Sequence, residues 1–328
     1  MIEAVGLTKR YGPRTAVADL RFTVRPGTVT GFLGPNGAGK STTMRLILGL
    51  DAPSSGTVTV GGRRYADHPA PLREVGAMLE ARSVHTGRSA YHHLAALAAT
   101  HGIPRRRVEQ VIDLVGLGEA AHRRVGGFSL GMGQRLGIAG ALLGDPGTLL
   151  LDEPVNGLDP EGIRWVRTLL TSLAAEGRTV LVSSHLMGEM ALTAEHLIVI
   201  GRGRLIADTS VEEFTRRASH RTVRVRTPEA ARLGGLLSAA GARVGAGERP
   251  DVIEVAGADS ERIGRLAARY GLPLVELTPQ PASLEEAFME LTRDAVEYQS
   301  ADRPAPALRP VTALVTAPVV DAVEEVAG

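Results

Sequence analysis

A glycine-rich segment near the N-terminus has the residue types and spacing needed to bind phosphate groups. It runs from Gly34 to Ser41 as GPNGAGKS and fits the pattern G-x-x-x-x-G-K-[ST]. Glycines let the backbone curl so that successive N–H groups face inward, and a helix N-terminus adds partial positive charge. The ammonium group of Lys40 can reach the outer phosphates, and the hydroxyl of Ser41 can bind Mg²⁺. We therefore expect a polyphosphate site made by Gly34, Pro35, Asn36, Gly37, Ala38, Gly39, Lys40, Ser41 and Thr42.

An acidic motif follows a wholly apolar run further along the chain. The run LLL at 149–151 is typical of a strand buried in a parallel sheet, and Asp152 and Glu153 come directly after it. Because ligands of open α/β sheets bind beyond the carboxyl ends of the strands, we expect both acids beside the phosphate site. Asp152 can then hold Mg²⁺ together with Ser41, and Glu153 can orient or deprotonate a water molecule that attacks the terminal phosphate.

Lysine is scarce in this chain, and that scarcity narrows the class of nucleotide-binding protein. Only Lys9 and Lys40 are lysines, so 35 of the 37 basic residues are arginines. Arginine is the usual basic residue of this sequence, so a lysine in the phosphate loop is an exception to that usage. Guanine-specific GTPases recognise their base with an N-K-x-D motif, and no lysine follows position 40, so that class is excluded. A small-molecule kinase would need a substrate lid, for which the sequence has no signature.

Composition excludes several other classes of function. The length of 328 residues suggests roughly two domains, at about 100–200 residues per domain. A net charge of +1 leaves no basic surface typical of nucleic-acid binding, and the absence of cysteine excludes disulfides, thiol nucleophiles and cysteine-bound zinc. No uncharged apolar run reaches the roughly 18–20 residues that span a bilayer, and the N-terminus lacks the apolar core of a secretory signal. These features indicate a cytoplasmic protein without a nucleic-acid partner.

Strand-like and helical segments alternate through residues 1–218. The predicted strands are 2–7, 20–24, 28–33, 57–62, 149–151, 179–183, 197–200 and 204–207, and the predicted helices include 40–50, 129–143, 163–175 and 186–194. Such alternation predicts an α/β domain around a mainly parallel sheet. Two further helical stretches flank residues 101–104, so we expect a helical subdomain at about 85–145.

A second, smaller unit is predicted for residues 219–294. Its segments follow the order β-α-β-β-α-β, which is the split βαβ pattern of a small α+β domain. Ser283 and Glu286 have the spacing of a capping box and predict a last helix that runs through Leu291. Residues 295–328 are rich in proline, alanine and valine without a helical period, and we expect them to form a flexible tail.

Four more short motifs occur in a consistent order. Residues 128–135 read FSLGMGQR, which is similar to the pattern L-S-G-G-Q-x-Q-R, and residues 156–159 read NGLD. His185 follows a predicted strand, and Tyr11 belongs to the segment KRYG. Together with the phosphate loop and the acidic motif, these motifs resemble the ATP-binding cassette (ABC) family over about residues 1–215. The chain is therefore similar to the ATP-binding P-loop subunit of a bacterial ABC transporter.

The resemblance implies a role for each of these motifs. Tyr11 would stack on adenine, His185 would be the switch histidine that contacts the γ-phosphate, and Asp159 would belong to the D-loop. The signature residues would complete the ATP site of a second copy; they are Ser129, Leu130, Gly131 and Gln134. Two copies would thus enclose two ATP molecules head to tail, and hydrolysis with Glu153 as the base would loosen the pair.

One position departs from the family's pattern. The glutamine of the Q-loop is expected within residues 75–80, where Glu80 occurs instead. Glutamate has a similar reach and can contact Mg²⁺ or water, so Glu80 is a candidate catalytic residue. Its charge near the triphosphate predicts an altered Mg²⁺ dependence or weaker coupling, with nucleotide binding retained.

The resemblance also implies partners and a location. A single cassette without a membrane span is expected to act on a separate transmembrane permease, at the cytoplasmic face of the cell membrane. The helical segment 85–125 would receive a coupling helix from that permease. Residues 283–291, SLEEAFMEL, are similar to the C-terminal extension on ATPases of bacterial drug, antibiotic and bacteriocin exporters. The implied function is therefore ATP hydrolysis that powers export.

Two other functions stay open at this point. The first is a soluble ABC ATPase that acts on ribosomes or DNA. Such proteins carry two cassettes or long coiled coils, and this sequence has neither. The second is a regulatory cassette with weak hydrolysis, which Glu80 keeps open.

Overall fold

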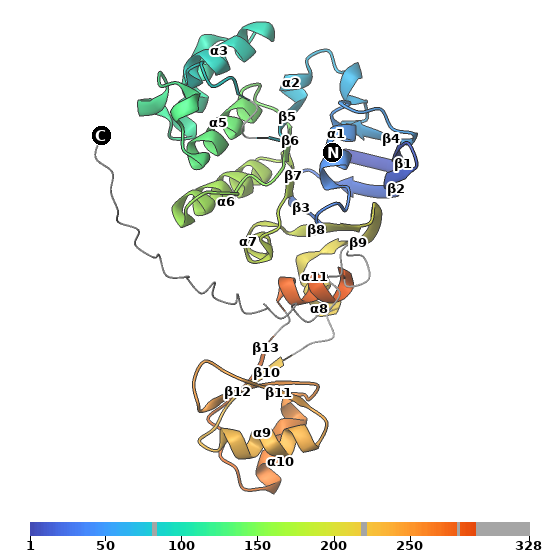
Figure 1. The fold of residues 1–328 in the computed structure, drawn as a ribbon, viewed down its shortest axis with the longest axis vertical. Coiled ribbons are helices and arrows are strands. Elements are labelled where there is room, and N and C mark those ends of the chain that lie inside the picture. The colour runs from blue at the N-terminus through green and yellow to red at the C-terminus, as the bar shows by residue number, and fades with distance from the viewer. Residues whose placement is uncertain (81–83, 218–221, 281–282, 293–328) are drawn as a thin grey trace, which may run out of the picture. The chain divides into compact units, whose positions relative to one another are not determined.

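The computed structural model describes residues 1–80, 84–217, 222–280 and 283–292, and a six-stranded sheet lies at the centre of the first part of the chain (Figure 1). Its strand order is β5-β6-β7-β3-β8-β9. The strands are β3 (Val29–Leu33), β5 (Val75–Met78), β6 (Thr148–Leu151), β7 (Thr179–Ser183), β8 (His196–Gly201) and β9 (Arg204–Ser210). The first five in this order run parallel, and β9 is antiparallel to β8. The expected mainly parallel α/β sheet is therefore confirmed.

A three-stranded antiparallel sheet covers one face of the central sheet. It consists of β1 (Ile2–Tyr11), β2 (Arg14–Val24) and β4 (Ser55–Val60), in the order β2-β1-β4. Helix α1 (Lys40–Ile47) contributes Met44 and Ile47 to the core between the two sheets. Phe22 of β2 and Phe32 of β3 meet in the same core, with their ring centroids 5.9 Å apart. The helix that follows the phosphate loop is thus fixed by apolar contacts on both sides.

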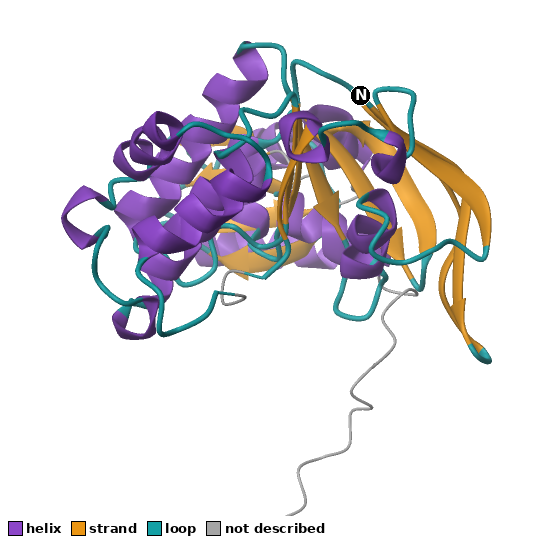
Figure 2. Cartoon of the chain, turned by 90° about the horizontal axis from the view of Figure 1, so that it is seen from above, coloured by secondary structure: helices purple, strands orange, loops and turns teal. Residues whose placement is uncertain are grey.

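The opposite face of the central sheet is covered by helices, as Figure 2 shows. These helices are α3 (Ala90–Thr100), α4 (Arg105–Leu114), α5 (Leu130–Leu142), α6 (Pro160–Ala175) and α7 (Met187–Thr193). Successive side chains of a strand point to opposite faces, so Leu150 packs toward α1, whereas Leu149 and Leu151 pack toward the helices. Among the described residues, no helix combines the length and the apolar character needed to cross a membrane.

Three short elements are absent from the expectations drawn from the sequence. They are α2 (Pro71–Glu74), α8 (Val211–Arg217) and strand β5. β5 occupies the start of the segment expected to be the Q-loop, because Val75 and Met78 are buried beside β6 at 1% and 4% exposure. The loop that carries Glu80 therefore begins only after Met78.

The second unit forms a four-stranded antiparallel sheet with two helices. Its elements are β10 (Thr222–Arg226), α9 (Ala230–Ala239), β11 (Arg243–Ala246), β12 (Val252–Ala256), α10 (Ser260–Arg269) and β13 (Glu276–Gln280). The strand order β11-β12-β10-β13 gives the expected split βαβ topology. Val225, Leu233 and Ile263 belong to a core that includes both helices and no residue of the first sheet among those described.

The last described helix, α11 (Leu284–Thr292), differs from expectation in what it packs against. The predicted capping box is present, since the Glu286 amide donates to Ser283 Oγ at 3.1 Å and the Ser283 amide donates to Glu286 Oε2 at 2.8 Å. However, Leu284 and Phe288 belong to the core of the first part of the chain, where α11 contacts α7 and α8. The expectation that residues 219–294 form one accessory unit is therefore wrong for this helix. The tail expected at 295–328 lies outside the described residues.

Candidate active site

A cavity of about 640 Å³ lies beyond the carboxyl ends of β3 and β6. Its walls come from the glycine-rich loop, the acidic motif and parts of β1 and β2. The lining residues are Tyr11, Arg14, Thr15, Ala16, Pro35, Asn36, Gly37, Ala38, Gly39, Lys40, Ser41, Thr42, Asp152, Glu153 and Arg202. Two motifs more than 100 residues apart are thus brought together at the edge of the sheet predicted for them.

Close packing shapes the glycine-rich loop. Gly39 has a φ of 103°, and a Cβ atom there would lie 2.6 Å from the carbonyl oxygen of Ala16. Gly34 has the same limit, because a Cβ atom would collide with the carbonyl oxygen of Ile200. Only glycine therefore lets the loop lie against β2 and β8 and begin α1 at Lys40.

Lys40 is nearly buried under this loop, with 9% of its surface exposed. Its Nζ atom donates to the carbonyl oxygens of Gly34 at 2.5 Å and Pro35 at 3.3 Å. Burial lowers the pKa of the ammonium group, while the charges of Glu153 and Asp152 raise it. An ammonium group held in such a place is stabilised by a further negative charge, which a phosphate group in the cavity would supply.

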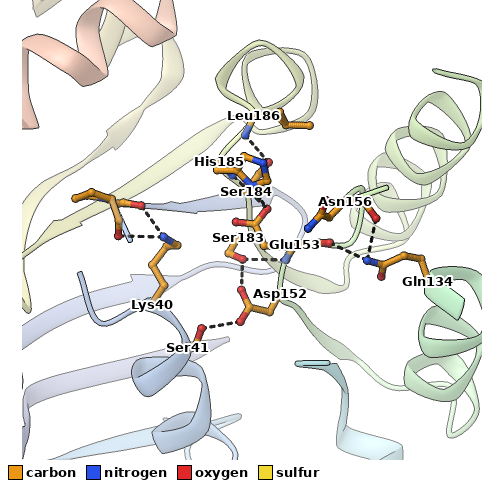
Figure 3. A network of polar contacts seen from close by, with 12 residues as sticks. Lys40, Ser41, Gln134, Asp152, Glu153, Asn156, Ser183, Ser184, His185 and Leu186 are labelled. Atoms are coloured by element: carbon orange, nitrogen blue, oxygen red, sulfur yellow. Dashed lines mark hydrogen bonds and ion pairs between the residues drawn. The ribbon is translucent and has the colours of Figure 1, made fainter. Parts of the chain in front are cut away.

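Asp152 is held between two hydroxyl groups from different elements, as Figure 3 shows. Ser41 Oγ donates to Asp152 Oδ2 at 2.8 Å, and Ser183 Oγ at the end of β7 donates to Asp152 Oδ1. The amide of Glu153 in turn donates to Ser183 Oγ at 3.0 Å. Hydroxyl and carboxylate oxygens beside a phosphate site suit Mg²⁺, which commonly binds one or two carboxylates together with substrate phosphates. Ser41 and Asp152 therefore fit the metal role expected of them.

Glu153 adopts an unusual backbone conformation that places its carboxylate against His185. Its φ of 51° is rare for a residue other than glycine, and such strain is common at functional sites. Glu153 Oε2 lies 2.7 Å from His185 Nδ1 and accepts a longer hydrogen bond, 3.3 Å, from the His185 amide. Both side chains stay partly exposed, at 25% and 54%. The acid lines the cavity, and the histidine contacts it without being one of the lining residues.

Tyr11 and Glu80 were both expected beside the nucleotide, and only Tyr11 is among the residues that line the cavity. The Tyr11 ring is 46% exposed and lines the cavity, where a planar base can reach it. Glu80 is exposed and lies outside the cavity lining, although its charge contributes to raising the pKa of Arg45. The catalytic role expected of Glu80 stays a prediction.

Several residues of the site were not predicted from the sequence, among them two arginines and Ser183. Arg14, the first residue of β2, and Arg202, in the turn between β8 and β9, line the cavity. Arg202 has a φ of 48° and lies in the turn Gly201-Arg202-Gly203 that links β8 to β9. Ser183 bridges the two acids, yet it is an ordinary strand residue by sequence. Only the strand order, which places β7 beside β6, reveals its position.

The signature and D-loop residues lie outside the cavity of their own chain. Ser129 caps α5 by accepting a hydrogen bond from the Met132 amide at 3.2 Å, and Asp159 caps α6 by accepting one from the Gly162 amide at 2.8 Å. Leu130 follows Ser129 and is 40% exposed. Gly131, in the first turn of α5, lies close to Leu158. This exposed helix start remains available to another molecule.

Gln134 occupies a different environment from the one expected for a signature residue. It is only 5% exposed, and its Nε2 atom donates to the carbonyl oxygens of Asn156 at 3.1 Å and Glu153 at 3.4 Å. Gln134 thus connects α5 to the turn that follows Glu153 within its own chain, and its contact in trans stays a prediction.

Family models and proteins of similar sequence also indicate an ATP-binding protein. One family model, described as "ABC transporter", matches residues 17–156, and another, described as "Domain of unknown function (DUF8746)", matches residues 221–285. The chain is 42% identical over 216 residues to the uncharacterized ABC transporter ATP-binding protein YhcH of Bacillus subtilis, covering 65% of this chain and 71% of that protein. It is 40% identical over 220 residues to the bacitracin transport ATP-binding protein BcrA of Bacillus licheniformis, covering 66% and 72%.

The fold comparison gives the same result. A solved ATP-binding subunit of an ABC transporter superimposes with a TM-score of 0.61 and 27% identity, covering 66% of this chain and 92% of the other. The chain therefore belongs to the family of ABC transporter ATP-binding proteins, and it is an ATPase of that family.

Proposed function

We propose that two copies of this chain bind and hydrolyse MgATP head to tail and thereby power an exporter whose membrane permease is a separate chain. Glu153 is the general base, His185 orients it and contacts the γ-phosphate, and Lys40 binds the outer phosphates. Tyr11 stacks on the adenine base. The protein would then work at the cytoplasmic face of the membrane, bound to the permease.

One observation carries the catalytic part of this proposal. A continuous line of hydrogen bonds runs from Ser41 through Asp152 and Ser183 to Glu153 and His185. Ser41 and Asp152 would hold Mg²⁺, which neutralises charge on the outer phosphates when it is bound. His185 engages one oxygen of the Glu153 carboxylate and leaves the other to accept a proton from the attacking water. The base and the metal ligands therefore keep a fixed relation to each other.

The arrangement of two copies is supported by the position of the signature residues, which do not line the cavity of their own chain. The exposed start of α5, with Ser129 and Leu130, is not part of its own cavity. A helix N-terminus is a favourable place for an anion, so this surface can cover the γ-phosphate held by another copy. Reciprocal contacts of this kind generate a closed dimer with two sites.

The transport part of the proposal draws on similar proteins and on a second cavity. BcrA is described as a bacitracin transport protein, which supports an antibiotic or peptide as the exported cargo. A groove of about 640 Å³ beside the start of α4 contains Arg73, Arg106 and Arg107 around the apolar Ile103. Part of it, residues 103–110, belongs to the segment 85–125 expected to receive a permease helix. Co-purification with a membrane protein encoded next to this chain is the corresponding test.

Substitution of the general base tests the catalytic proposal. Glu153→Gln keeps the hydrogen-bonding shape but removes the basic carboxylate, so turnover should fall by about 100-fold or more, the usual size of a general-base contribution. ATP binding should persist, and a dimer that depends on ATP should accumulate in size-exclusion chromatography. Glu109→Gln, on the exposed face of α4, makes the same chemical change away from the cavity and should leave turnover unchanged. Normal turnover in Glu153→Gln would remove this residue from its role.

A further inference from the structure

The second lysine of the chain contacts the ring that faces the base. Lys9 Nζ donates to the carbonyl oxygen of Ala52 at 2.7 Å and lies 4.9 Å from the centroid of the Tyr11 ring. An ammonium group at this distance is attracted to the π face of an aromatic ring. Lys9 does not line the cavity, whereas Tyr11 does. In a chain with 35 arginines and two lysines, both lysines therefore belong to one site: Lys40 under the phosphate loop and Lys9 beside the aromatic ring.

The hydroxyl group of the same ring is fixed by an ion pair. Tyr11 Oη donates to Asp51 Oδ2 at 2.8 Å, and Arg45 contacts both oxygens of that carboxylate, at 2.8 Å through Nε and 3.3 Å through Nη2. Hydrogen bonds from Arg45 and then Tyr11 lower the pKa of Asp51, so its carboxylate stays ionised at neutral pH. The bond to Asp51 raises the pKa of Tyr11, which keeps the phenol protonated as a donor. The ring is therefore held at its edge and on its face.

This arrangement connects the ring to the phosphate loop through a single helix. Arg45 lies in the last turn of α1, and Lys40 is the first residue of the same helix. Neither Asp51 nor Arg45 lines the cavity, so both support the ring from outside it. A rigid α1 thus sets the separation between the ring and the groups that bind phosphate.

We propose that Asp51 and Lys9 are positioning residues that hold the Tyr11 ring as the stacking surface for the base and so determine how strongly the site prefers a nucleotide to a bare polyphosphate. The inference rests on the proposed function in one respect, namely that the cavity binds ATP. A ring with free rotation would have to be ordered at each binding event, and the two supports remove that entropic cost in advance.

The test compares two ligands on the full chain by calorimetry, MgATP and magnesium tripolyphosphate, because only the first has a base. Asp51→Ala should weaken ATP binding about tenfold, the size expected for loss of a hydrogen bond to a charged group, and should change tripolyphosphate binding less than about twofold. Lys9→Met should act in the same direction, by about threefold, since it removes one exposed cation–π contact. Asp67→Ala is the matched control, because Asp67 also accepts two hydrogen bonds from one arginine, Arg64, away from the cavity. It should leave both affinities unchanged.

A second variant separates positioning from general stability. Tyr11→Phe keeps the ring but loses the hydroxyl that bonds Asp51 and Thr42, so it should weaken ATP binding at least as much as Asp51→Ala does. The double variant should be no weaker than Tyr11→Phe alone. Equal weakening of both ligands by Asp51→Ala, or an unchanged ratio of the two affinities, would overturn the inference. A wild-type chain with no preference for ATP over tripolyphosphate would also overturn it, while leaving the phosphate site and the role of Glu153 intact. A chain that binds neither ligand would instead refute the proposed function.

Discussion

Ser183 has no chemical role of its own, yet it determines how the two acids of the site are placed. Its hydroxyl group donates to Asp152 and accepts from the Glu153 amide, and its side chain is completely buried. Ser183→Ala leaves that amide without its partner and removes one of the two donors to Asp152. We therefore expect kcat to fall about tenfold, consistent with the cost of an unsatisfied buried polar group, and the Mg²⁺ concentration for half-maximal activity to rise.

Steady-state ATPase assays with a Mg²⁺ titration measure both effects. Ser184→Ala is the control, because Ser184 is also buried and its hydroxyl accepts from the Leu186 amide, outside the Asp152–Glu153 pair. It should change the Mg²⁺ dependence little. A wild-type Mg²⁺ dependence in Ser183→Ala would show that Asp152 does not need this support.

Some residues of the site can be predicted from a short stretch of sequence, whereas others depend on contacts between distant segments. Lys40 and Ser41 were predictable, because the spacing of their motif indicates phosphate chemistry. Asp152 and Glu153 were predictable because they follow an apolar run typical of a buried parallel strand, in a chain that also has this loop. Ser183 depends on which strand lies beside β6, and that pairing is formed between segments about 30 residues apart. Gln134 fitted a motif by sequence but is buried in the fold, since a pattern of letters does not show which face of a helix turns inward.

At the scale of elements, α11 is predicted to stabilise the ATP-binding part of the chain. Leu284 is 3% exposed and belongs to the same core as α7 and α8. Leu284→Ala should lower the free energy of unfolding by about 2–5 kcal/mol, the usual cost of truncating a buried leucine. ATP stabilises only the folded part of the chain that binds it and raises the midpoint temperature at which that part unfolds. Leu284→Ala should lower the midpoint of this same thermal transition.

Leu291 provides the control for this measurement, since it lies on the same helix with 38% of its surface exposed. Leu291→Ala should lower the same transition by less than about 1 kcal/mol. Leu284→Ala could instead lower only the midpoint of a transition that ATP does not shift. That result would contradict the packing of α11 on the first part of the chain.

The elements that the sequence predicted share a strong local pattern. The run of leucines in β6 and the capping box of α11 can each be recognised within a few residues. β5 has only four residues, and its strand conformation depends on pairing with β6. The capping box likewise predicted that α11 begins near Leu284 but contained no information about the core that it would join. Tertiary contacts decide such cases, and no short window of sequence contains them.

At the scale of the whole molecule, the incomplete cavity of one chain makes a prediction about two. Leu130 is exposed at the first position of α5 and does not line its own cavity, so its substitution should not affect how a single chain binds ATP. In the proposed head-to-tail pair, however, the same position would face the phosphates held by the other copy. Leu130→Glu would then bring a negative charge toward another in a desolvated interface, which costs several kcal/mol. Acidic residues are favourable in the first helical turn, so the fold of α5 should tolerate the change.

The expected result is therefore a separation of binding from turnover. ATP affinity measured by calorimetry on Leu130→Glu should equal that of the wild type, while ATPase activity should fall by about tenfold or more. When the change is combined with Glu153→Gln, the dimer that depends on ATP should no longer form. Leu114→Glu places the same charge on an exposed leucine at the end of α4 and should alter neither quantity. Full ATPase activity in Leu130→Glu would mean that each chain hydrolyses ATP without the signature surface of a second copy, and it would contradict the proposed head-to-tail pair.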